Sequence, residues 1–163
     1  MTETKDHIDV RQEQWASVAP DIDTRGMALF GRMRQIYAGV RPQIEEIFAR
    51  YGIDGGDADV LFTLYRSGAP FRLRPTELYR WLMVSSGGIT HRLNRLQKAG
   101  LIERIAEPQD KRSLLVSLTT EGQRVAREAF AEDMALESQR LEVLTEDEQQ
   151  RLSALLRKLL LSI

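Results

Sequence analysis

The residues best suited to chemistry in this chain are polar and cationic side chains between Ile89 and Lys98. On a helix with about 100° per residue, Ile89, Leu93 and Leu96 fall in one narrow apolar stripe. Thr90 lies at the side of the stripe. The residues that point away from it are small, polar or basic: Gly87, His91, Asn94, Arg95 and Lys98. A helix with one buried face and one short polar face has the form needed to enter the major groove of duplex DNA.

The side-chain types on this face fit two kinds of contact. Asn94 and Arg95 can make paired hydrogen bonds to the edges of adenine and guanine, and Thr90 and His91 lie on or beside the same face. Lys98 and Ser86 are better suited to phosphate oxygens. The alternative is an ordinary amphipathic helix with a solvated face, which would be the commoner explanation if the helix stood alone.

A charged hairpin after this helix favours the nucleic-acid interpretation. Strand-like runs at 101–105 and 114–118 flank the segment Glu107 to Arg112. Lys111 and Arg112 could reach an adjacent minor groove, where negative potential attracts arginine, and Asp110 could support the shape of the tip. The alternative is a charged turn that only keeps the hairpin soluble.

The elements around these residues form a helix-turn-helix pattern. Pro75 suits the first position of a short helix, and Ser85 or Ser86 can cap the helix that ends at Gly100. Before them, Asp57 is placed to cap a helix that ends near Ser67. A short helix, a tight turn and a second helix are typical of DNA-binding domains.

The flanking segments are predicted to be helical. A short helix is expected around 10–18, and a long one from Met27, with a kink or break near Val40 because Pro42 removes a backbone donor. Beyond Thr119 two more helices follow, and Thr145 with Glu148 makes a capping box for the last one. The fold class is therefore mainly α with a small β-hairpin wing: a winged helix-turn-helix with a helical dimerisation lobe.

Composition excludes several classes of function. The chain has 163 residues, no cysteine and only two histidines, so disulfides and thiol chemistry are excluded and a metal site is not expected. No phosphate-binding glycine loop or nucleophile elbow is present, so neither an enzyme nor a cofactor is predicted. No export signal or membrane span is visible, which predicts a cytoplasmic protein without membrane partners.

Charge is distributed unevenly along the chain. Residues 66–112 carry ten Lys/Arg against four Asp/Glu, a net charge of +6, whereas the remaining residues carry −7. The basic middle segment is suited to a polyanion and the acidic, leucine-rich flanks to another role such as self-association. Chance clustering of solvated arginines is the alternative.

The segment from Asp57 to Gly122 resembles the MarR (multiple antibiotic resistance regulator) family. The resemblance rests on sequence blocks whose order and spacing are specific: 75–78 (PTEL), 85–90 (SSGGIT) with Arg95-Leu96, 98–104 (KAGLIER), 110–113 (DKRS) and 118–122 (LTTEG). It implies a homodimer, built from the N- and C-terminal helices, that binds a pseudo-palindromic double-stranded DNA site. The implied division is 1–56 for dimerisation and a ligand-pocket lid, 57–118 for DNA binding and 119–163 for dimerisation.

The chain also resembles the urate-responsive branch of that family. In that branch an N-terminal helix supplies a tryptophan, the helix before the helix-turn-helix an aspartate, and the recognition helix and following strand one arginine each. The matching residues are Trp15, Asp59, Arg92 and Arg104. Arginine forks suit planar anions and an indole can cover an aromatic ring. The alternative roles are phosphate contacts or an ion pair with Asp59 for the arginines, and dimer packing for Trp15.

These observations predict a ligand-responsive regulator, with repression as the expected mode and a small anion such as urate as the releasing ligand. Two alternatives stay open: a MarR-type regulator that responds to a different aromatic or organic acid, and a winged-helix adaptor that binds protein. An adaptor should carry a neutral recognition face, and the net charge of +6 in residues 66–112 argues against it.

Overall fold

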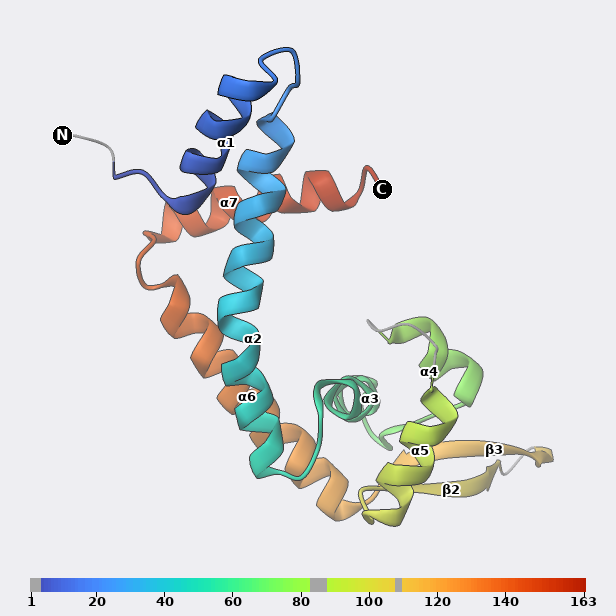
Figure 1. The fold of residues 1–163 in the computed structure, drawn as a ribbon. Coiled ribbons are helices and arrows are strands. Elements are labelled where there is room, and N and C mark those ends of the chain that lie inside the picture. The colour runs from blue at the N-terminus through green and yellow to red at the C-terminus, as the bar shows by residue number, and fades with distance from the viewer. Residues whose placement is uncertain (1–3, 83–87, 108–109) are drawn as a thin grey trace. The chain divides into compact units, whose positions relative to one another are not determined.

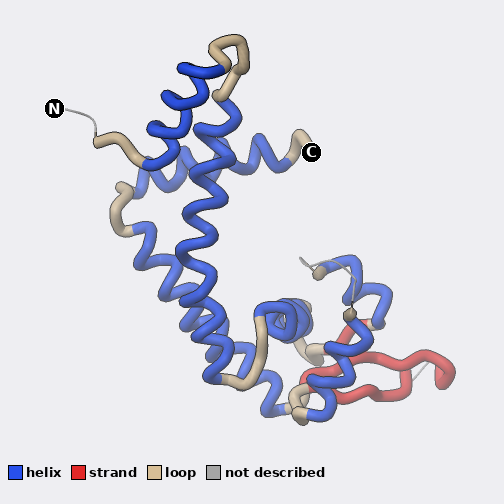
Figure 2. Tube along the Cα trace, viewed as in Figure 1, coloured by secondary structure: helices blue, strands red, loops and turns tan. Residues whose placement is uncertain are grey.

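The computed structural model describes residues 4–82, 88–107 and 110–163. The described chain is mostly helical, with one small three-stranded sheet (Figure 2). It divides into two compact units, Met1–Gln43 (the N-terminal unit) and Ile44–Ile163 (the C-terminal unit). The predicted fold class is confirmed, while the functional division at residues 56 and 118 stays a prediction.

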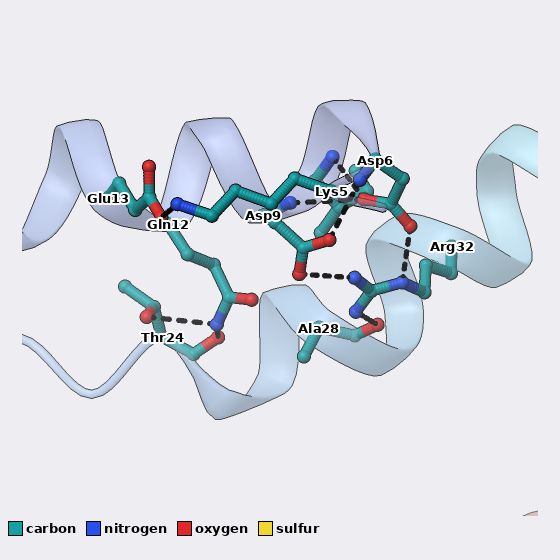
Figure 3. Close-up of polar contacts among 9 residues, drawn as sticks. Lys5, Asp6, Asp9, Gln12, Glu13, Thr24, Ala28 and Arg32 are labelled. Atoms are coloured by element: carbon teal, nitrogen blue, oxygen red, sulfur yellow. Dashed lines mark hydrogen bonds and ion pairs between the residues drawn. The ribbon is translucent and has the colours of Figure 1, made fainter. Parts of the chain in front are cut away.

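The N-terminal unit contains α1 (His7–Val18), the π-helical segment η1 (Met27–Gly31) and the start of α2 (Arg32–Arg50). Asp6 caps α1, and its side chain accepts hydrogen bonds from the first-turn amides of the helix. Arg32 binds both Asp6 at 2.7 Å and Asp9 at 2.6 Å (Figure 3). Because Arg32 opens α2, these ion pairs fasten α1 alongside the following helix.

Helix α2 corrects one prediction. It continues from Arg32 to Arg50 with Pro42 inside it, so of the predicted kink or break near Val40 the break does not occur. A proline inside a helix costs one backbone hydrogen bond and is destabilising by about 3 kcal/mol. Ile47 and Phe48, both buried, follow the proline, and their packing keeps this segment helical.

The C-terminal unit begins with the last turns of α2 and holds the rest of the fold (Figure 1). Its further elements are α3 (Gly55–Arg66), β1 (Arg72–Leu73), α4 (Pro75–Trp81), α5 (Ile89–Lys98), β2 (Ile102–Glu107), β3 (Asp110–Leu118), α6 (Thr120–Leu141) and α7 (Glu146–Leu160). The antiparallel sheet has the order β1-β3-β2. The predicted hairpin is therefore confirmed, and β1 is an additional strand.

Two helix boundaries, the start of α4 and the end of α5, are determined by local sequence. Pro75 opens α4 as predicted. Helix α5 ends before Gly100, whose φ of +72° closes the helix, with hydrogen bonds of 3.0 Å from the Gly100 amide to the Gln97 carbonyl and from the Leu101 amide to the Leu96 carbonyl. Glycine fits this left-handed position without steric cost, so α5 ends where the sequence predicts.

The beginning of α3 differs from the prediction. Asp54, and not Asp57, is the N-cap, and its side chain accepts a 2.8 Å hydrogen bond from the Asp57 amide. Asp57 is the third residue of the helix and its carboxylate returns a longer bond of 3.4 Å to the Asp54 amide. The two aspartates form a capping box, because a capping partner three residues later satisfies the second free amide.

One hydrophobic core lies beneath α5. Val60, Leu61 and Leu64 of α3 are fully buried, and they belong to one cluster with buried residues of α4, α5, the strands and α6. Phe62 makes edge-to-face contacts with Phe48 and Phe130, with ring centroids 5.8 and 5.2 Å apart. This core fixes the helix that carries the candidate functional residues.

Helix α7 has no buried residue. The predicted capping box is confirmed: Thr145 caps α7, and the Glu148 amide donates to its hydroxyl at 3.3 Å. Its leucines are nevertheless exposed within this chain: Leu152, Leu155, Leu156, Leu159 and Leu160. We call these five residues the α7 leucine face.

Candidate functional site

The polar face of α5 is the centre of the candidate site. Ile89, Leu93 and Leu96 are only 1–3% exposed, which confirms the predicted buried stripe. Thr90, His91, Asn94, Arg95 and Lys98 are all exposed, and Arg92 is half-buried at the flank. The burial on one side leaves a row of polar and basic groups on the other.

Part of the predicted contact set cannot be placed. Ser86 lies outside the described residues, and α5 begins after Gly88, which is its N-cap. Asp110, Lys111 and Arg112 lie at the start of β3, but their side chains are outside what the structure describes. Their roles at phosphate and in the minor groove stay predictions.

Arg95 has partners that the helical wheel did not indicate. Its Nη2 lies 2.5 Å from an oxygen of Asp54 and 2.7 Å from Oδ1 of Asp57. The contact with Asp57 is close enough for an ion pair, although it is not aligned as a hydrogen bond to that oxygen. The guanidinium therefore bonds across to the first turn of α3, and a contact of Arg95 with bases stays a prediction.

The electrostatics of this pair follow from its geometry. The Asp57 carboxylate raises the pKa of Arg95, against the opposing effect of partial burial, and Asp54 adds to it. For Asp54, burial acts to raise the pKa, but the Asp57 amide and the two arginines outweigh it, so the pKa of Asp54 is lowered. Arg95 and Asp54 are therefore both ionised across the neutral range.

Arg104 of β2 also bonds to α5. Its Nη2 donates to Oδ1 of Asn94 at 2.7 Å. Because this oxygen is engaged, the Asn94 amide nitrogen is the group left to donate to a third partner. Strand β2 therefore orients one of the exposed polar side chains of α5.

A cavity of about 260 Å³ lies between α4, α5 and the sheet. Arg104, Thr90 and the hydroxyl of Tyr79 supply its polar side-chain groups, and its walls are mainly apolar. The remaining lining residues are Pro75, Leu93, Leu114 and Val116. A small apolar cavity with a few polar groups is the common form of a ligand pocket, although this one lies just below the usual range of about 300–1,000 Å³.

The four residues assigned to a ligand site occupy different elements. Arg104 lines the cavity, whereas Arg92 does not and instead donates to Asp54 at 3.1 Å. Asp59 is half-buried in α3, and Trp15 lies in α1 of the N-terminal unit with 46% exposure. A common role for these four residues in one ligand site stays a prediction.

Sequence reasoning missed three contributors at the start of α3. Asp54 and Asp57 hold Arg95, and Gly56 lies directly beneath the guanidinium of Arg92. The spacing of the two aspartates was a usable signal, because acidic residues three apart are typical of a helix start. No pattern within either segment indicates that α5 lies against the start of α3.

Neither a metal site nor a membrane-spanning helix is found among the described residues. Within residues 4–82, 88–107 and 110–163, no group of three or more His, Asp or Glu side chains is arranged to hold a metal ion. None of the helices in these ranges combines the length and apolar composition that crossing a membrane requires.

Comparison with known sequences gives a consistent result. A model of the MarR family matches residues 51–113. The HTH-type transcriptional regulator PecS from Dickeya dadantii is 31% identical over 144 residues, which cover 88% of this chain and 87% of PecS. The multiple antibiotic resistance protein MarR from Escherichia coli is 37% identical over 89 residues, which cover 54% of this chain and 62% of MarR.

Solved structures have the same fold. A mutant of MarR from E. coli complexed with operator DNA has a TM-score of 0.69 at 26% identity, and the match covers 90% of this chain and 97% of that one. The MepR–DNA complex of S. aureus has a TM-score of 0.72 at 21% identity, over 83% and 98% of the two chains, which shows a common fold. The family-model match at 51–113 contains α3, α4, α5, β2 and the start of β3, which are the elements of the candidate site.

Proposed function

Because this chain belongs to the MarR family of DNA-binding transcription regulators, we propose that it is a repressor released from its operator by a small planar anion such as urate. It binds a pseudo-palindromic site as a homodimer, in the cytoplasm where chromosomal DNA lies. The proposal assigns the chain no reaction of its own.

The observation that carries the proposal is the division of α5 into a buried and an exposed face. Three apolar side chains hold the helix in the core, while the exposed Thr90, His91 and Asn94 can meet base edges. Lys98 at the end of the helix is suited to phosphate. Ser86, Lys111 and Arg112 extend the contacts to the backbone and the minor groove in this proposal.

The α7 leucine face supports the homodimer. Five leucines on one helix are exposed in the single chain, and a contiguous apolar surface of this kind marks an interaction site. A second copy of the chain presents the same face, so the two can bury each other around a twofold axis. A twofold dimer in turn matches a palindromic operator.

We propose an anion as the ligand because the site offers two arginines. Arg92 at the flank of α5 and Arg104 in the 260 Å³ cavity both offer guanidinium forks, which suit planar carboxylates and urate. Trp15 would cover the ring, and Asp59 would oppose the negative charge. A different aromatic or organic acid is the alternative ligand, since guanidinium groups alone do not select urate.

The test is fluorescence anisotropy of the duplex upstream of the gene, titrated with protein in the presence and absence of urate. Specific binding that urate releases is the expected result. Binding that ignores urate but responds to another organic acid would replace the ligand and keep the regulator. If the protein shows no specific binding even at low salt, the adaptor alternative takes its place.

Two arginine variants test the proposed ligand site, and the affinity of each for the duplex without ligand is measured first, because Arg92 and Arg104 also contact Asp54 and Asn94. Arg104→Lys keeps the charge but loses the fork, so the urate response should weaken about tenfold or more. Arg92→Ala should reduce the response as well. The matched control is Arg72→Ala, which removes one exposed cation from β1 and should leave the response unchanged. If this control loses the response as much as Arg92→Ala does, Arg92 acts only through net charge.

A further inference from the structure

The contact between the start of α3 and α5 includes a buried carboxylate, which is not needed to pack the apolar stripe of α5. Asp57 is a charged residue with only 2% exposure. A carboxylate removed from water is costly unless a cation or hydrogen-bond donors compensate it. Arg95 supplies that cation, because its Nη2 lies 2.7 Å from Asp57 Oδ1.

A second arginine reinforces the contact. Arg92 and Arg95 are three residues apart, so both project from the same side of α5. Arg92 Nη1 donates to Asp54 Oδ1 at 3.1 Å, and Arg95 Nη2 bonds the other oxygen of Asp54 at 2.5 Å. One carboxylate therefore joins both arginines, and the two helices are connected by three ion pairs.

Gly56 provides the space for this arrangement. A Cβ at Gly56 would lie 1.1 Å from Nη1 and 2.0 Å from Cζ of Arg92, so no side chain fits there while Arg92 keeps its place. On the neighbouring residue, the Gly55 amide donates to Glu45 at 3.2 Å. The first turn of α3 is thus covered by Arg92 at Gly56 and by Glu45 at Gly55.

We propose that Asp54, Gly56 and Asp57 form an α3 latch that sets the orientation of α5 through Arg92 and Arg95. This inference rests on the DNA binding of the proposed function and assigns Arg95 a positioning role. To reach a base, Arg95 would have to leave Asp57 buried without a cation. The latch instead aims the other exposed side chains of α5, Thr90, His91 and Asn94, at the groove.

The direction in which DNA affinity changes on Asp57→Asn distinguishes the latch from simple electrostatics. Asp57→Asn removes a negative charge from a lobe that meets a polyanion, so electrostatics alone predicts tighter binding. The latch predicts weaker binding, because Arg95 loses its buried partner and α5 loses its orientation. We expect an affinity loss of about tenfold for the upstream duplex.

The experiment measures duplex affinity by anisotropy for Asp57→Asn, Arg95→Ala and the double variant, with thermal unfolding of each as the check of folding. Arg124→Ala is the matched control, because Arg124 pairs with Glu121 and Glu128 on the surface of α6. In the latch the double variant binds no worse than either single variant. All three variants keep the parent's ranking of operators with single base changes, since Arg95 contacts no base.

If Asp57→Asn unfolds, Asp54→Asn and Gly56→Ala provide the same test. Asp54→Asn weakens the ion pairs with both arginines, and Gly56→Ala only displaces the Arg92 guanidinium. Each should weaken binding about threefold to tenfold. The latch is overturned if Asp57→Asn, or in its place these two variants, bind as tightly as the parent. It is also overturned if Arg95→Ala loses discrimination at one base pair. Failure of the parent itself to bind the duplex would instead refute the proposed function.

Discussion

Helices α5 and α7 have the same sequence pattern and opposite environments. Both carry apolar residues at spacings of three and four, with polar and charged residues between them. In α5 the apolar stripe is at most 3% exposed, because α3, α4 and the sheet cover it. In α7 no residue is buried within the chain.

The difference shows that an apolar stripe predicts a partner surface without saying which molecule supplies it. For α5 the partner is the same chain, so its leucines stabilise the monomer. For the α7 leucine face the proposed partner is a second copy, so its leucines stabilise an assembly. Substitutions in the two helices should therefore change different measured quantities.

The largest expected effect is in the buried stripe. Leu96→Ala should lower the free energy of unfolding by about 2–5 kcal/mol, because it removes packed atoms and leaves a cavity. Denaturant titration at a fixed, low protein concentration measures it. Leu156→Ala is the matched change in α7, and an equal loss for both at that concentration would contradict the comparison.

The next effect concerns assembly. Leu155→Glu places a charge on the α7 leucine face and should raise the dimer dissociation constant about 100-fold, since an unpaired charge is costly to bury. Sedimentation velocity measures the monomer fraction. Gln150→Glu adds the same charge at a polar position of α7 and should leave the dimer intact. A monomeric Gln150→Glu variant would mean that charge and not burial controls assembly.

A smaller effect concerns Asp133, a charged residue buried on α6. Burial, and then the nearby Glu137, raise the pKa of Asp133 from 3.8 to about 6. Between these pH values the unfolded chain releases its proton while the folded chain retains it, so the stability contributed by this group falls as pH rises through about 6.

Asp133→Asn stays neutral and should raise the unfolding midpoint by about 2–4 °C at pH 7.5. The gain should shrink towards pH 4, where the parent is protonated in both states. Differential scanning fluorimetry across this pH range measures it. A gain that does not depend on pH would show that the carboxylate is not the cause.

The smallest effects are expected at two helix caps. Thr119 caps α6, and its hydroxyl also lies 2.7 Å from the Gly100 carbonyl at the end of α5. Thr119→Ala should cost about 0.5–1 kcal/mol of unfolding free energy. Thr145→Ala removes only the cap of α7 and should cost less, because that helix contributes no buried residue. Parallel denaturation curves would rank the two, and the reverse order would contradict the comparison.

Most of the fold could be predicted from local sequence. Three helix boundaries are set by backbone geometry and neighbouring amides, at Pro75, Gly100 and the Thr145–Glu148 pair. Such effects are local, so the sequence around each residue is enough to predict them. The uninterrupted α2 and the strand β1 could not be predicted in this way. Packing of Ile47 and Phe48 outweighs the effect of Pro42, and Arg72 and Leu73 become a strand only by pairing with β3.

The candidate site was predictable to the same extent. Helical periodicity gave the buried stripe and the exposed residues of α5, and it placed Arg92 at the flank. The partners of Arg95 depend on how α3 meets α5, which no pattern within either segment contains. For the same reason the Arg104–Asn94 hydrogen bond joins residues of two elements and could not be inferred from spacing.

The sheet order β1-β3-β2 has a consequence for how the chain folds during synthesis. The central strand, β3, is the last of the three to be synthesised, so Arg72 of β1 cannot pair with Ser117 until β3 has been made. Contacts between distant residues slow folding, because the loop between them must close first. Helices α3, α4 and α5 therefore leave the ribosome before their sheet can form, and the strand that completes the wing also completes the lobe.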